Sequence, residues 1–199
     1  MKKISLLSLL FFVFNMATAQ QEISTAYATQ ATNMFAPLDK NRIPHKVLLD
    51  YGFEYTNLKA YNGILTDSTM VDVPTLKHIY NTLFSSRVTS ATTGFINPNN
   101  FDSNWKNRTA GTITVSGLYY KYNAFINDAI NLGKVNFVNN QFQDKFVSGV
   151  WQNPYQEFQA FAMAPAISKY EGLSFTVKIP STIFYSNYQS LVQSIQIDF

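Results

Sequence analysis

The sequence contains no cysteine, and this absence excludes several chemistries at once. A chain without thiols has no disulfide bond, no cysteine nucleophile, no zinc–thiolate site and no iron–sulfur cluster. A chain of this length can still bury a hydrophobic core without cross-links. Aromatic residues make up 16% of the sequence, so the material for such a core is present.

Histidine is scarce as well, which limits acid–base catalysis. The chain has two histidines, His45 and His78. His78 falls between polar neighbours on the solvent-exposed face of an expected helix and His45 follows a proline, so we interpret both as surface residues rather than general bases.

The sequence also lacks the common motifs of other catalytic and binding sites. The Ser-Gly pairs at 116–117 and 148–149 lack the preceding glycine of a nucleophile elbow. The sequence shows no metal-binding loop and no phosphate-binding glycine loop, and we expect neither a metal nor a cofactor.

Asp50 and Glu54 are a candidate pair of catalytic carboxylates. On a helix, residues four apart share one face and could act as the acid and base of a glycosidase. Gly52 lies between them and argues against a regular helix. We therefore interpret both residues as capping or surface carboxylates, and we keep a secreted hydrolase as the weakest alternative.

Long apolar runs are confined to the N-terminus. There two lysines precede the apolar residues 4–14, and residues 17–19 form an Ala-Thr-Ala cleavage site. This order predicts a secretory signal peptide over residues 1–19, cleaved after Ala19. No later run is long enough to span a membrane. We expect a secreted, extracellular or cell-surface protein, with the periplasm as the other destination.

Loss of this leader also changes the charge of the chain. The formal net charge of +3 falls to +1 when Lys2 and Lys3 are removed. A nearly neutral chain with scattered basic residues is not typical of a nucleic-acid-binding protein. We expect other surface proteins, or downstream domains of a longer polypeptide, as partners.

Residues 20–90 show mainly helical patterns. An apolar stripe over residues 23–34 ends at Pro37, and residues 44–50 fit either a short helix or a buried strand. The strongest helix has Asp72 just before it and apolar residues at positions three and four apart, namely Leu76, Ile79, Tyr80, Leu83 and Phe84. Residues 91–111 are rich in Asn and have no sustained period, so we predict a linker held to its neighbour by Phe95, Phe101 and Trp105.

From residue 112 the apolar pattern alternates with a period of two. Its phase changes at residues 116–117, which predicts a β-bulge or a bend between two strands. Further alternating segments are 135–137, 156–164, 173–179 and 194–199. We predict an α+β fold with an N-terminal helical part and a C-terminal antiparallel β-sandwich-like part at 112–199. The last strand, 194–199, would be an open sheet edge, as in a chain that is truncated or ends early.

Four aromatic residues of the expected β region are candidates for stacking on sugar rings, namely Trp105, Tyr119, Trp151 and Tyr155. The favoured interpretation is that such rings are core residues or cross-strand pairs.

Two modification motifs are also present. Asp67-Ser68-Thr69 resembles a bacterial O-glycosylation motif with Ser68 as the acceptor, and Asn107 begins an N-glycosylation sequon.

Three segments resemble the N-terminal region of large secreted bacterial proteins: VWQNPYQEFQAFAMAPAI (150–167), IPHKVLLDYGFEYTNLKAYNGILTDS (43–68) and VKIPSTIFYSN (177–187). In such proteins a run like SIQIDF (194–199) continues into a Gly-Asp-Gly turn of a PKD-like β-domain. An α/β-hydrolase-type domain and a type IX secretion tail come later. The resemblance covers most of the mature chain, and it implies no catalytic residue within it.

These patterns together predict a non-catalytic N-terminal module of an exported or cell-surface protein, with a structural or adhesive role. A carbohydrate-binding module that uses exposed aromatic residues is the alternative, with glycans as the ligand.

Overall fold

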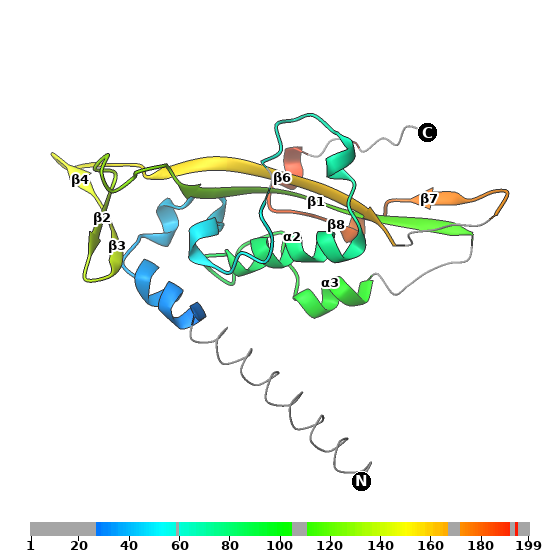
Figure 1. Ribbon diagram of the computed structural model, residues 1–199, viewed down its shortest axis with the longest axis horizontal. Coiled ribbons are helices and arrows are strands. Elements are labelled where there is room, and N and C mark those ends of the chain that lie inside the picture. The colour runs from blue at the N-terminus through cyan, green and yellow to red at the C-terminus, as the bar shows by residue number, and fades with distance from the viewer. Residues whose placement is uncertain (1–26, 59, 105–110, 167–171, 192–193, 195–199) are drawn as a thin grey trace, which may run out of the picture.

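The computed structural model describes residues 27–58, 60–104, 111–166, 172–191 and 194, and the fold is α+β (Figure 1). Residues 27–35 are helical, as the sequence predicts. The other elements are the helices α2 (Val73–Ser85) and α3 (Pro98–Asn104) and the strands β1 (Thr112–Phe125), β2 (Val135–Val138), β3 (Gln141–Asp144), β4 (Phe146–Val147), β5 (Val150–Trp151), β6 (Tyr155–Pro165), β7 (Thr176–Lys178) and β8 (Phe184–Ser186). Short 3-10 turns lie at Lys40–Arg42, Pro44–Lys46, Leu49–Tyr51, Asp67–Thr69, Ser181–Ile183 and Gln189–Leu191.

Strand β1 is the centre of the main sheet. It pairs antiparallel with β6 from Val115↔Pro165 to Phe125↔Tyr155 without a shift in register. On its other edge it pairs with β7 and β8, and both of these pairings are parallel. The expectation of a wholly antiparallel β region is therefore wrong for these two strands.

The expected bulge or bend at residues 116–117 is also wrong, because the register runs through it unchanged. All six residues from Val115 to Tyr120 are buried. A strand covered on both faces has no reason to alternate strictly between apolar and polar residues. The change of phase in the sequence marks burial on both faces, and the strand itself continues.

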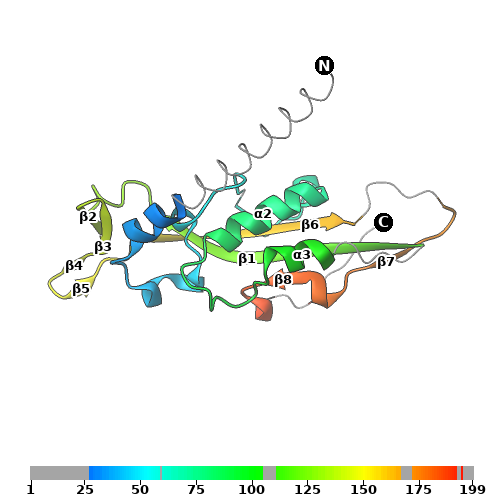
Figure 2. The same cartoon turned by 90° about the horizontal axis from the view of Figure 1, so that it is seen from below.

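One face of the sheet carries the helices, as Figures 1 and 2 show. Leu118, Tyr120 and Tyr122 of β1 share this face and pack with α2, whose buried apolar residues are Leu76, Tyr80 and Leu83. The facing positions of β6 are small, with Ala160, Ala162 and Ala164. Small side chains there let the helix lie close to the sheet. A second sheet facing this one is not seen among the described residues, so the sandwich is not confirmed.

Helix α2 forms where its pattern predicts. The Asp72 carboxylate caps it by accepting a hydrogen bond of 2.8 Å from the Thr75 backbone N–H, and Pro74 lies in its first turn. Residues 44–50 are neither a regular helix nor a strand. They form two 3-10 turns, Pro44–Lys46 and Leu49–Tyr51, joined by Val47 and Leu48, which are fully buried.

The segment expected as a linker contains α3 and contributes to the core. Phe101 is 1% exposed and stacks on Tyr80 with ring centroids 4.0 Å apart. Phe95 stacks on Tyr120 in the same way at 4.5 Å. Residues from both of the regions expected on either side, such as Leu76 and Leu118, belong to this single core cluster.

Several expected features lie outside the described residues. These are the leader with Ala19, the aromatic anchor Trp105, the sequon at Asn107, and all of the expected last strand except Ser194. In the alternating run before it, 173–179, the structure has the short strand β7.

Gly94 provides a test of how closely the segment between α2 and α3 packs on β8. Its φ is +82°, and a β-carbon there would lie 2.0 Å from the Ser186 carbonyl oxygen. Gly149 has nearly the same φ, +80°, with nothing within 4 Å. We expect Gly149→Ala to lower the free energy of unfolding by about 1–2 kcal/mol, because a residue with a β-carbon is strained in the left-handed backbone conformation. Gly94→Ala should cost about 1–3 kcal/mol more because of the clash. Urea unfolding of both variants measures this, and equal losses would contradict the close packing.

Candidate functional site

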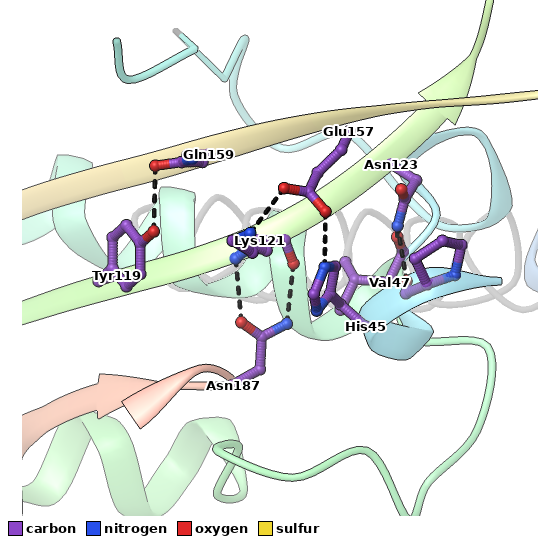
Figure 3. Close-up of polar contacts among 9 residues, drawn as sticks. His45, Val47, Tyr119, Lys121, Asn123, Glu157, Gln159 and Asn187 are labelled. Carbon is purple, nitrogen blue, oxygen red and sulfur yellow. Dashed lines mark hydrogen bonds and ion pairs between the residues drawn. The ribbon is translucent and has the colours of Figure 1, made fainter. Parts of the chain in front are cut away.

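A network of charged side chains lies on the sheet face opposite α2 (Figure 3). Lys121 of β1 faces away from Tyr120 and Tyr122, because side chains alternate along a strand. Its Nζ donates a hydrogen bond of 2.8 Å to Oε1 of Glu157 on β6. The other carboxylate oxygen, Oε2, lies 2.7 Å from Nε2 of His45. Glu157 thus joins a residue of the N-terminal segment to one of the central strand.

Tyr188 closes this network from the C-terminal side. The Lys121 ammonium lies 4.8 Å from the centroid of its ring. The His45 ring meets it edge-on at 5.5 Å. The side chains of His45 and Lys121 are only 17% and 16% exposed, whereas that of Glu157 is 41% exposed. The carboxylate is therefore the part of the network that solvent reaches most easily.

His45 is held in an unusual backbone conformation. Its φ is +54° and that of Lys46 is +56°, and neither residue is a glycine. Non-glycine residues keep such a backbone conformation only where surrounding contacts hold it in place. Asn123 of β1 does this, because its Nδ2 donates to the Pro44 carbonyl at 2.6 Å and its backbone N–H donates to the Val47 carbonyl at 2.9 Å.

Asn187 completes the edge of β1 next to the network. Its Oδ1 accepts a hydrogen bond of 2.9 Å from the Lys121 N–H, and its Nδ2 donates one of 2.8 Å to the Lys121 carbonyl. A side-chain amide that bonds both groups of one residue replaces a neighbouring strand. At the end of β1 the Asp50 carboxylate accepts from the Phe125 N–H at 2.8 Å. Desolvation raises the pKa of Asp50, and this hydrogen bond opposes the change.

The charges of the network stabilise one another. Desolvation raises the pKa of Glu157, but the hydrogen bonds from Lys121 and His45 outweigh it, so the pKa ends below its usual value. The hydrogen bond to Glu157 raises the pKa of Lys121. Burial raises the pKa of the neighbouring Tyr119, whose hydroxyl donates to Oε1 of Gln159 at 3.0 Å. Glu157 is therefore held as a carboxylate with both oxygens engaged.

Three of the four aromatic residues proposed for sugar stacking lie in the described part of the chain, and these three do not form a common exposed surface. Tyr119 and Tyr155 are 8% and 7% exposed, so neither presents a free ring face. Trp151 is half-buried, donates its indole N–H to Asp144 at 2.9 Å and has the Arg42 guanidinium 5.4 Å above its ring. These positions agree with the interpretation of such rings as packed residues.

The other predicted residues have simple surroundings. Ser68 is exposed in a 3-10 turn, and its hydroxyl lies 2.8 Å from that of Thr66. His78 is exposed on α2. The turn that carries Asp50 ends at Tyr51, so the helix that would place Asp50 and Glu54 on one face does not exist.

The sequence interpretation missed the network of His45, Lys121 and Glu157. One signal was available, because Lys121 is the only charged residue in β1 and Glu157 the only one in β6. A single charge in each of two long strands is more easily kept if the two meet across the sheet. Nothing in the sequence placed His45 beside them.

Glu157→Gln tests the electrostatic role of the network. A carboxylate whose folded pKa is lowered stabilises the fold above its unfolded pKa, and this stabilisation is lost as the pH falls through the folded pKa. At pH 7 we expect Glu157→Gln to cost about 0.2–1 kcal/mol, a small value because the carboxylate is well exposed. The difference from the wild type should shrink as the pH falls below the ordinary glutamate pKa of 4.5 and should vanish only below the lowered pKa of the folded protein.

Thermal unfolding between pH 3 and pH 7 measures this difference. Glu54→Gln is the matched control, since Glu54 is exposed and has no ion pair within the described part of the chain. A loss of stability in Glu157→Gln that does not change with pH would contradict the ion-pair network.

Comparisons with known proteins found no match for this chain. No family model matches it, and neither a curated protein nor a solved structure does. None of the helices within the described ranges is long and apolar enough to cross a membrane. The resemblance to large secreted bacterial proteins stays a prediction.

Proposed function

We propose that this chain is a non-catalytic module of an exported or cell-surface protein, with a structural or adhesive role. The observation that carries the proposal is the state of Glu157. Both of its oxygens are engaged, and its pKa is lowered. A general acid or base works best with a pKa near the working pH. Glu157 is moved away from that range, which supports a role in joining segments.

Exposed apolar side chains at one end of the sheet support the adhesive role. Two hairpins, β2–β3 and β4–β5, lie there, at the opposite end from β7 (Figures 1 and 2). Five of their apolar side chains are 42% to 64% exposed, namely Phe137, Val138, Phe146, Val147 and Val150. Exposed apolar patches commonly mark protein contact surfaces. The partner we propose is another surface protein or a downstream domain of a longer polypeptide.

The paired edges of β1 support the structural role. The strand is 14 residues long, and β6, β7, β8, Asn187 and Asp50 all bond to it. Such bracing suits a rigid module that positions its neighbours. The carbohydrate-binding alternative has less support, because Tyr119 and Tyr155 are buried.

A hydrolysis panel tests the non-catalytic role. We expect the purified protein to hydrolyse broad sets of chromogenic esters and glycosides no faster than buffer, because the engaged carboxylate is not placed for proton transfer. Wild type and Glu157→Gln are assayed side by side to exclude a contaminating enzyme. Hydrolysis that Glu157→Gln abolishes without unfolding the protein would contradict the proposal.

Export is tested by the mature N-terminus. We expect the protein to leave the cytosol with Gln20 as its first residue, because the Ala-Thr-Ala motif directs cleavage after Ala19. Mass spectrometry of the cytosolic, periplasmic, surface and culture-medium fractions measures this. Replacing Ala17 and Ala19 with bulky residues should block the processing. An intact Met1 on the folded protein in the cytosol would contradict the proposal.

A further inference from the structure

A shallow pocket lies beside the C-terminal half of α2, away from the charged network. Its volume is about 460 Å³, and its lining residues are Tyr55, Asn81, Phe84, Ser85, Arg87 and Pro98. They come from the loop after residue 52, from α2 and the residues that follow it, and from the start of α3. The pocket thus combines a cation, hydroxyl and amide groups, and apolar walls in one place.

The Arg87 guanidinium is fixed in this pocket by its neighbours. It lies 3.5 Å from the centroid of the Phe84 ring and 5.4 Å from that of Phe95. Its Nε donates a hydrogen bond of 2.8 Å to the Phe84 carbonyl. Its backbone pairs with that of Val47. A guanidinium stacked on aromatic rings loses little further freedom when it binds a ligand.

Arg87 has no carboxylate partner within the described residues. The four ion pairs found there use Arg42, His45, Lys77 and Lys121 as cations. The single hydrogen bond of its side chain uses Nε, so the two Nη groups remain available in the described part of the molecule. Burial lowers the pKa of Arg87, and among the described residues the phenols of Tyr80 and Tyr120 oppose this change. Partial burial of a cation without an opposite charge is costly unless another group supplies that charge.

The position of Arg87 also limits the kind of anion. The pocket adjoins the C-terminal end of α2, where the helix dipole is negative. Such a field disfavours a doubly charged phosphate more than a singly charged carboxylate. One guanidinium edge matches the two oxygens of a single carboxylate.

We propose that this pocket binds a small carboxylate, with the Nη groups of Arg87 holding its two oxygens. Asn81 and Tyr55 supply further hydrogen-bonding groups, and Phe84 and Pro98 contact the body of the ligand. The carboxylate could belong to an amino-acid derivative or to an acidic sugar, since both present the same group. This inference does not depend on the proposed structural or adhesive role.

Isothermal titration calorimetry with matched probes tests the proposal and separates the two sources. N-acetylphenylalanine is compared with N-acetylphenylalanine amide, and galacturonate with galactose. We expect saturable binding of at least one acid, on the order of tenfold or more tighter than its neutral counterpart. The acid that binds more tightly identifies the source. Equal binding of acids and neutral compounds, or no binding of either acid, would overturn the proposal.

Variants assign the binding to Arg87. Arg87→Gln should weaken acid binding on the order of tenfold or more, because it removes the charged hydrogen bonds. Asn81→Asp keeps Arg87 and its stacking but places a carboxylate in the pocket, so it should weaken acid binding even if Arg87→Gln does not fold. Lys178→Gln removes a positive charge from exposed β7 and should bind like the wild type. Wild-type affinity in folded Asn81→Asp, or a loss in Lys178→Gln as large as in Arg87→Gln, would overturn the assignment.

Discussion

The pairing of the backbone along β1 is the constraint on which the rest of this structure depends. The middle of the strand is buried on both faces, so its N–H and C=O groups have no water to bond with. β6 satisfies one edge over most of the strand. The other edge is shared in turn by β7, β8, the Asn187 amide, the chain at Val47–Leu48 and the Asp50 carboxylate. Segments that are distant in the sequence must therefore meet along one line.

The charged network follows from this arrangement. Asn123 draws the turn before Val47 to β1 and so brings His45 next to Glu157. β8 leads the chain to Asn187 and Tyr188, which brings an aromatic ring over Lys121. Lys121 and Glu157, which meet across the sheet, are 36 residues apart in the sequence. Each of the other contacts joins residues that are more than 60 positions apart. The network helps fix where the first and last described segments meet the central strand.

Local features were predicted from the sequence, and long-range ones were not. The α2 helix was predicted because its cap at Asp72 and its apolar spacing are encoded within 15 or so consecutive residues. The strand positions around β1 and β6 were predicted from alternation in the same way. The parallel pairing of β7 and β8 has no local signature, because a short strand pairs wherever the chain returns to an open edge. The side chain of Asn187 acts as a strand neighbour only once β8 is in place, so no pattern around it could indicate this role.

The lack of a local signature for long-range contacts also limits what the sequence predicts for the aromatic residues. The sequence favoured packed rings over exposed ones but could not say where they pack. Tyr80 and Tyr120 are buried between α2 and the sheet and use their hydroxyls on backbone groups. Tyr120 donates to the Gly94 carbonyl at 2.5 Å, and the Tyr80 hydroxyl both donates to and accepts from Ile96 at 2.7 Å, with burial raising the pKa of Tyr80 to about 12. The ring stack that begins with these residues ends at Phe84 and Phe95, where Arg87 covers it. Arg87 is thus a partly buried cation that this stack fixes and that has no carboxylate partner among the described residues. This is the place where the packing of the core fixes the group that we propose as the carboxylate ligand's partner.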